Sequence, residues 1–194
     1  LDGELSKLLP VCPDLVGRLG YTAFWNSPRG QYLEDYSSWE GDNYQYPSDL
    51  KAWYTYVYET VRRYRGRVRY WEVWNEPDLF GKYKTYGDLN YLDMYAASAR
   101  AAAKVRGANL FEIGGPATTG LYQNWLENLI KYVDKNNLRM DFLSWHKYTT
   151  DLSQFEKDVK AARSWAENIP ALVNLKYYVT EWGFNSEIDK GYDE

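Results

Sequence analysis

Cysteine and histidine are almost missing from the sequence: Cys12 and His146 are the only ones among 194 residues. An internal disulfide and a Cys/His zinc site are therefore excluded. No run of eighteen apolar residues occurs, and no charged segment leads into an apolar run and a small-residue cleavage site, so we expect no membrane span. Repeats, low-complexity tracts and linkers are also lacking. A single domain over residues 1–194 is the simplest organisation.

The sequence also has no excess of positive charge. Its 23 Lys and Arg against 27 Asp and Glu give a net charge of −4 and a pI near 5.2. A nucleic-acid partner held by phosphate neutralisation is therefore not expected. One short stretch is basic, but it straddles the end of a predicted helix, where cations are favourable. Its members are Arg62, Arg63, Arg65, Arg67 and Arg69.

Aromatic residues are abundant, with 9 Trp, 20 Tyr and 6 Phe. Trp and Tyr combine a flat apolar face with a polar edge, which suits a cleft that stacks on a partner such as a sugar ring. The alternative is that most of these rings lie in the core, because Trp and Tyr are commonly half-buried or buried.

Strand and helix patterns alternate along the chain. Aromatic and β-branched runs predict strands, and apolar residues at helical spacing predict helices. Ser48 is the expected N-cap of the first helix, and Gly114-Gly115-Pro116 is expected to end the third strand. The expected strands are Leu15–Trp25, Val68–Trp74, Leu110–Ile113, Met140–Trp145 and Leu175–Thr180, and the expected helices are Ser48–Tyr64, Tyr86–Val105, Leu121–Tyr132 and Leu152–Glu167.

This alternation predicts an α/β fold with parallel strands joined by helices, either a barrel or an open sheet. An open nucleotide-binding sheet would carry a Gly-rich loop, G-x-G-x-x-G or G-x-x-x-x-G-K-[ST], and neither occurs. The barrel is favoured. Barrels place their active sites at the carboxyl ends of the strands, which is where the polar clusters of this sequence fall.

Two of these clusters contain a glutamate, Glu76 after the second strand and Glu181 at the end of the last. Alternation along a strand predicts that Glu76 shares a face with Trp74 and Glu72, and Glu181 a face with Val179 and Tyr177. Both could point into one barrel mouth. Two facing carboxylates are the equipment for glycoside hydrolysis, which requires no metal.

Other polar groups could serve the same mouth. His146 and Tyr148 are expected on one face with Ser144 and Phe142. A tyrosine hydroxyl could hold an ionised glutamate, and the imidazole could bond substrate or a carboxylate, unless the backbone satisfies it. The Asn75 amide could bond a sugar hydroxyl, and Trp182 could supply apolar surroundings. Trp25 and Asn26 could line the sugar site.

Other acidic residues are open to different interpretations. Glu72 is the rival acid, but pairing inside or beneath the barrel with Arg69 or another cation is the favoured interpretation, since active sites lie at strand ends. Asp78 and Glu34 are expected to be solvated loop charges.

Three motifs in the sequence resemble those of a known enzyme family. They are Trp71-Glu72-Val73-Trp74-Asn75-Glu76-Pro77-Asp78, Phe142-Leu143-Ser144-Trp145-His146-Lys147-Tyr148 and Thr180-Glu181-Trp182-Gly183. They resemble strand-end motifs of clan A retaining glycoside hydrolases, most of all family 39, which contains β-xylosidases and α-L-iduronidases; family 5 is the second choice. The resemblance implies a (β/α)8 barrel, with Glu76 as general acid/base and Glu181 as nucleophile. It also implies that Asn75 bonds the substrate 2-hydroxyl, with His146 and Tyr148 in support.

The resemblance implies a retaining enzyme that cleaves β-glycosidic bonds of plant-type oligo- or polysaccharide, with xylo-oligosaccharide favoured and no cofactor. Five strands fit only strands three to seven of a barrel, so we expect an incomplete barrel that associates with itself or with further polypeptide. The alternatives are an inactive carbohydrate-binding remnant and a family 5-like endo-β-glucanase or mannanase. Enzymes of this class that act on polymers are usually exported, so secretion is favoured.

Overall fold

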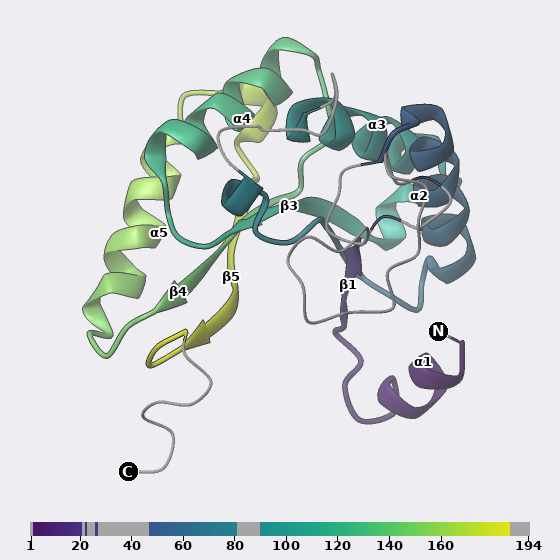
Figure 1. Ribbon diagram of the computed structural model, residues 1–194, viewed down its shortest axis with the longest axis horizontal. Helices are drawn as coiled ribbons and strands as arrows, with labels where there is room; N and C mark the ends of the chain where they lie inside the picture. Colours follow the sequence, from purple (N-terminus) through teal and green to yellow (C-terminus); the bar gives the residue numbers. More distant parts are fainter. Residues whose placement is uncertain (1, 21, 23–25, 27–46, 81–89, 187–194) are drawn as a thin grey trace.

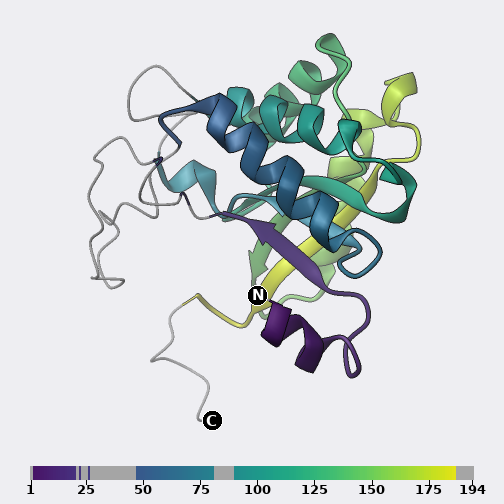
Figure 2. The same ribbon diagram turned by 90° about the vertical axis from the view of Figure 1, so that its right-hand side faces the viewer.

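A computed structural model describes residues 2–20, 22, 26, 47–80 and 90–186. Five parallel strands form one sheet in chain order, β1-β2-β3-β4-β5. Figures 1 and 2 show that the sheet is curled and that α2 to α5 follow its outer side. The strands are β1 (Val16–Leu19), β2 (Tyr70–Val73), β3 (Glu112–Thr118), β4 (Phe142–Tyr148) and β5 (Lys176–Gly183). The predicted incomplete α/β barrel is confirmed.

Helices connect the strands at each crossover that the structure describes in full. The described helices are α1 (Asp2–Leu8), which precedes β1, then α2 (Leu50–Tyr64), α3 (Tyr91–Lys104), α4 (Gln123–Lys135) and α5 (Ser153–Ala166), with short 3-10 turns η3 (Pro77–Phe80), η4 (Ala108–Leu110) and η5 (Pro170–Leu172). The described helices are too short or too polar to cross a membrane. The helix α3 was expected to begin at Tyr86, but residues 86–89 lie outside the described residues.

The main core fills the space between the outer side of the sheet and the helices. Trp71, Ile113 and Leu143 reach it from the strands, and Trp53 and Leu129 reach it from the helices, all at most 2% exposed. The buried Trp53 indole donates to Ser98 Oγ at 2.8 Å, which satisfies its polar edge. Many of the aromatic side chains are therefore core, as the alternative interpretation held.

The start of α2 differs from the prediction. Asp49, not Ser48, is the N-cap, because its carboxylate accepts from the amides of Lys51 and Ala52. Ser48 lies one residue earlier and donates its hydroxyl to the carbonyl of Asn26 at 2.9 Å. Both side chains can cap a helix, and the Ser48 hydroxyl is engaged by Asn26 instead.

The third strand was expected to end at its Gly-Gly-Pro sequence, but β3 continues through it to Thr118. Glycine is required at position 114, because a Cβ there would lie 2.1 Å from the carbonyl oxygen of Phe142 on β4. The glycine thus permits close pairing of β3 with β4. The glycine that suggested the end of a strand is instead needed because β3 and β4 pack closely at this position.

Candidate active site

The chain after β2 has an unusual backbone. Trp74 and Glu76 have φ angles of 73° and 46°, in the left-handed region that non-glycine residues seldom adopt. The amide of Trp74 donates to the carbonyl of Leu19 at 2.9 Å, and the amide of Glu76 donates to the carbonyl of Ala117 at 2.8 Å. Neighbouring strands on both sides thus hold this turn in place. Strained backbone of this kind clusters at functional sites.

This turn overturns part of the alternation prediction. Trp74 is buried on the helix side of the sheet, edge-on against Trp53 of α2, whereas Glu72 lies on the inner side and pairs with Arg18. Glu76 reaches the inner side through the turn, because β2 has already ended at Val73. Alternation assumes continuous extended backbone, which the two left-handed residues interrupt.

On β4 the prediction is confirmed. Ser144 and His146 lie on the inner side, where Ser144 Oγ accepts from the amide of Ala117 and His146 is fully buried. Tyr148 follows on the same side, and its hydroxyl donates to Glu181 Oε1. The phenol thus donates to a carboxylate, as expected.

Glu181 reaches the inner side through a β-bulge. Trp145 of β4 pairs with Val179, but the next residue, His146, pairs with Glu181, so Thr180 is the extra residue on β5. Tyr177 and Val179 pack against the main core on the helix side. The prediction that they share a face with Glu181 was therefore wrong, because one extra residue reverses the alternation.

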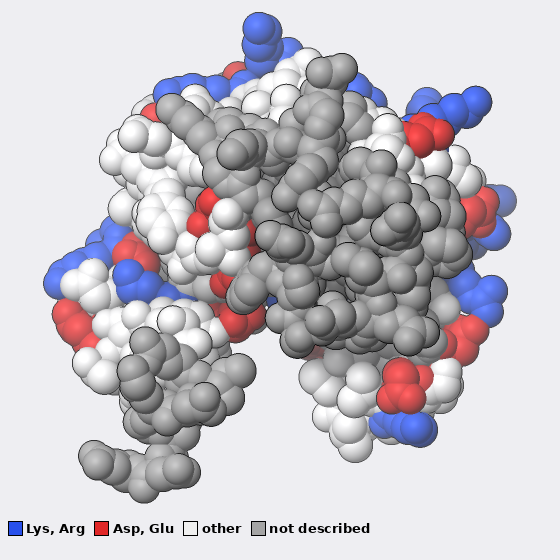
Figure 3. Space-filling view, viewed as in Figure 1, with Lys and Arg blue, Asp and Glu red and all other residues white. Residues whose placement is uncertain are grey.

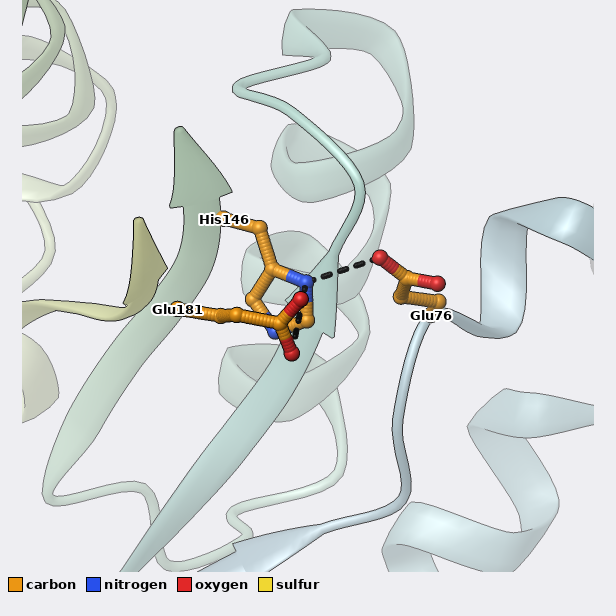
Figure 4. A group of neighbouring side chains, drawn as sticks. All are labelled: Glu76, His146 and Glu181. Carbon is orange, nitrogen blue, oxygen red and sulfur yellow. Dashed lines mark hydrogen bonds and ion pairs between the residues drawn. The ribbon is translucent and has the colours of Figure 1, made fainter. Parts of the chain in front are cut away.

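Glu76, His146 and Glu181 meet at the carboxyl ends of the strands (Figure 4). His146 Nδ1 lies 2.8 Å from Glu76 Oε1, with which it shares a hydrogen bond, and 3.8 Å from Glu181 Oε2. The donor atoms of the three side chains all lie within 4.8 Å of one another. Glu76 is the more buried glutamate, with 17% of its side chain exposed against 42% for Glu181.

A cation also faces this cluster. Arg18 of β1 lies 3.9 Å from a carboxylate oxygen of Glu181 and 3.9 Å from one of Glu72. The favoured interpretation of Glu72, pairing with a cation inside the barrel, is confirmed with Arg18 as the cation. Arg69 instead pairs with Asp14. By proximity alone, Glu76, His146 and Glu181 could hold a metal ion, but the permanent charge of the guanidinium opposes a divalent cation there.

The remaining predicted site residues differ in their positions relative to the cluster of Glu76, His146 and Glu181. Asn75 follows Trp74, and its buried Oδ1 has no hydrogen-bond partner among the described residues. Trp182 is 73% exposed beside Glu181. Asn26 is 4% exposed, and its amide bonds the backbone of Asp49, so it organises the start of α2. Trp25 and Glu34 lie outside the described residues.

Asp78 is not the solvated loop charge that the sequence predicted. Its carboxylate accepts from the amide of Thr119 at 3.0 Å and from the Thr119 hydroxyl. This contact joins the turn that carries Glu76 to the end of β3. The Asn-Glu-Pro-Asp sequence alone did not reveal the partner, because Thr119 lies forty-one positions away.

Carboxylates approach four of the five arginines in the basic stretch, and Arg65 donates to the carbonyl of Arg62. Arg62 pairs with Glu59, Arg63 and Arg67 both approach Asp2, and Arg69 approaches Asp14. On the face seen in Figure 3, Lys and Arg side chains are scattered around the periphery beside Asp and Glu and form no single basic patch.

Lower on the inner side, Tyr178 of β5 packs edge-on against Tyr70 and against Phe142. Burial, followed by the nearby Glu112 carboxylate, raises the pKa of Tyr178 to about 12. The inner side of the sheet is therefore aromatic below the Glu76, His146 and Glu181 cluster, with the Glu112–Lys176 ion pair nearby.

A curled parallel sheet with helices on its outer side and polar side chains at the carboxyl ends of its strands defines a class, the proteins built on an α/β barrel. The sequence model of glycosyl hydrolases family 39 matches residues 34–182, more than half of the chain. The chain belongs to this family.

Curated relatives agree with this assignment. A beta-xylosidase of Caldicellulosiruptor saccharolyticus is 32% identical over 154 residues, which is 70% of this chain and 31% of that protein. One of Geobacillus stearothermophilus is 31% identical over 119 residues, which is 58% of this chain and 23% of that protein. The chain thus spans less than a third of the length of each of these relatives.

Solved structures show the same fold. A glucosidase of Croceicoccus marinus superimposes with a TM-score of 0.65 at 26% identity, over 77% of this chain and 34% of that one. A family 39 β-xylosidase of Caulobacter crescentus superimposes with a TM-score of 0.61 at 25% identity, over 90% of this chain and 37% of that one.

Proposed function

We propose that this chain carries the catalytic centre of a retaining glycoside hydrolase that cleaves β-linked plant-type oligo- or polysaccharide. Xylo-oligosaccharide is the favoured substrate, because both curated relatives are named beta-xylosidases. The partner is a carbohydrate, and the reaction needs no cofactor.

One observation carries this proposal: the Glu76 and Glu181 carboxylates face each other across His146, with oxygens less than 4.8 Å apart. Retaining enzymes hold their two carboxyl groups about 5 to 5.5 Å apart, whereas inverting enzymes need about 6.5 to 9.5 Å to fit a water molecule. The short separation supports direct attack by one carboxylate.

The surroundings of the two glutamates support a division of roles. Glu181 accepts the Tyr148 hydroxyl and faces Arg18, and both contacts stabilise a carboxylate, as a nucleophile requires. Glu76 is more buried and shares a hydrogen bond with His146, through which a proton can be held at its Oε1. Glu76 is therefore the proposed general acid/base.

The reaction proceeds in two displacements. First, a Glu181 oxygen attacks the anomeric carbon while Glu76 gives its proton to the departing glycosidic oxygen, and a glycosyl ester forms on Glu181. Then Glu76 takes a proton from water, whose oxygen attacks the anomeric carbon and frees the Glu181 carboxylate. Each step returns Glu76 to the protonation state that the next step needs.

Two further side chains are proposed to contact the sugar. The Oδ1 of Asn75, which has no hydrogen-bond partner in the described part of the chain, is suited to accept a bond from a sugar hydroxyl, such as the 2-hydroxyl. Trp182 offers an exposed indole face on which a pyranose ring can stack. Trp25 stays a candidate from the sequence alone.

The test is hydrolysis of aryl β-xylosides and β-glucosides by the chain beside its Glu181→Ala variant, with the oligomeric state measured on the same samples. We expect turnover that is lost in the variant, with an NMR spectrum that shows the β-anomer as first product. An α-anomer as first product would contradict the retaining mechanism. Sugar binding without turnover in either protein would favour a carbohydrate-binding remnant.

A further inference from the structure

We propose that Arg18 is a positioning residue for this reaction: held by Glu72, its guanidinium orients the Glu181 carboxylate and keeps it charged. The inference rests on the proposed function and adds a residue that none of the sequence motifs contains. Its basis is that Arg18, next to the last residue of β1, lies within ion-pair distance of both Glu72 and Glu181.

Arg18 is placed by the pairing of β1 with β2. It lies directly opposite Glu72 in the register of the two strands, and its Nε lies 3.9 Å from Glu72 Oε2. Its terminal nitrogen lies 3.9 Å from Glu181 Oε2. Because β1 and β5 are the two ends of the strand order, this contact crosses the inner side of the sheet instead of following it.

Glu72 gives Arg18 its direction. Its side chain is only 2% exposed, and its Oε1 has no hydrogen-bond partner among the described residues. A buried carboxylate without compensation is strongly unfavourable, so it attracts the one cation that the described residues bring within ion-pair distance. Since the guanidinium is planar and rigid, fixing Nε toward Glu72 leaves the terminal nitrogen facing Glu181.

Glu181 is surrounded by groups from three other parts of the sheet. The hydroxyl of Tyr148 occupies its Oε1, while Arg18 and His146 approach its Oε2, and Glu76 lies beyond His146. Glu72 lies behind Arg18. Without the arginine, three carboxylates would share this space with one imidazole, and their repulsion would disfavour the ionised nucleophile.

The guanidinium also suits both displacements. Glu181 must be an anion when it attacks, and it must leave as an anion when water opens the glycosyl ester. A fixed positive charge beside Oε2 stabilises the carboxylate at the start of the first displacement and at the end of the second. Arg18 itself does not touch the anomeric carbon in this scheme, so it acts through Glu181.

The test compares Arg18→Met with Arg69→Met, which removes the same charge from the amino end of neighbouring β2. For Arg18→Met we expect kcat to fall about fivefold with little change in KM, and the acidic limb of the pH profile to move up by about half a pH unit, as for a partly exposed ion pair. Arg18→Lys should recover part of kcat and part of the pH shift. Arg69→Met should leave kcat and the pH profile unchanged.

A merely structural role would give a different result. If Arg18→Met lowers the thermal midpoint but leaves the pH profile and kcat unchanged, the arginine only ties β1 to β5 and the proposal is wrong. Should Arg18→Met fail to fold, Glu72→Gln keeps the shape of the anchor while removing its charge. Glu72→Gln should lower kcat, because the guanidinium loses its anchor, but it should not move the acidic limb of the pH profile up, because a neighbouring negative charge is also lost. An unchanged kcat in this variant would overturn the proposal.

A second readout does not depend on turnover. With 13C-labelled glutamate carboxyls, and Glu181→Gln to assign the signal, the titration midpoint of Glu181 should lie higher in Arg18→Met than in the unsubstituted chain. Equal midpoints would overturn the role of Arg18. Absence of turnover in the unsubstituted chain would instead count against the proposed function, so the two failures are distinguishable.

Discussion

A single methyl group added at Gly114 should disrupt the pairing of β3 with β4. The new Cβ would lie 2.1 Å from the carbonyl oxygen of Phe142 and 2.6 Å from its ring. A flexible side chain could move away at little cost, but the first of these contacts is with backbone. We therefore expect Gly114→Ala to push the two strands apart at this position.

The size of the effect follows from the hydrogen bonds that such a separation breaks. Loss of about two buried ladder bonds costs ~1–3 kcal/mol each, because their donors and acceptors stay away from water. The reduced freedom of the unfolded chain returns ~0.4–1 kcal/mol. The free energy of unfolding should fall by about 1–5 kcal/mol, a large part of the ~5–15 kcal/mol typical of a folded protein.

Urea denaturation followed by tryptophan fluorescence measures this change. Gly3→Ala is the matched control, because Gly3 lies in α1 and a Cβ there meets nothing within 4 Å. The control should be as stable as the unsubstituted chain or up to ~1 kcal/mol more stable. Equal denaturation midpoints for Gly114→Ala and the unsubstituted chain would refute the packing argument.

Two further predictions concern tyrosines of the inner side. Tyr148→Phe removes a hydrogen bond to the Glu181 carboxylate, and such a bond is worth ~1.5–3 kcal/mol. Because Glu181 is partly exposed, we expect kcat/KM for an aryl β-xyloside to fall only about tenfold. An unchanged kcat/KM would show that the contact does not matter to the reaction. The pKa of Tyr178, about 12, lies above the ordinary 10, so the stability that its neutral phenol contributes is complete below pH 10 and is lost as the pH rises toward 12. Urea unfolding at pH 9 and pH 11.5 should show a smaller loss of stability for Tyr178→Phe than for the unsubstituted chain, and equal losses would contradict the raised pKa.

Much of this fold follows from patterns within single segments. The alternation of apolar runs with helical spacings predicts five parallel strands and their connecting helices. All of these strands and helices are present, and only their boundaries differ from the prediction. The strand ends also identify Glu76, His146 and Glu181, because chemistry collects at the carboxyl ends of parallel strands. Periodicity is sufficient wherever the backbone stays regular.

The errors arise where the backbone is irregular or where contacts join distant segments. The left-handed residues Trp74 and Glu76 and the bulge at Thr180 each reverse a face, and no periodicity in the sequence reveals them. The contact of Asp78 with Thr119 joins two different strand ends. Arg18 did leave a signal, a charged residue between Val16 and Leu19 in an expected strand, but its partners depend on the curvature of the sheet.

The bulge at Thr180 makes the position of Glu181 depend on the number of residues in β5. Exchange of Thr180 for another residue changes one side chain, whereas one further residue inserted between Val179 and Glu181 would shift the pairing of Glu181 with His146 and turn the glutamate toward the helix layer. Ala117 is in the same situation on the other flank of β4, where the register of β3 also slips by one residue. At these two bulges the register of the sheet therefore depends on the number of residues more than on their type: an exchange of Thr180 or Ala117 leaves the register unchanged, whereas an inserted residue shifts it.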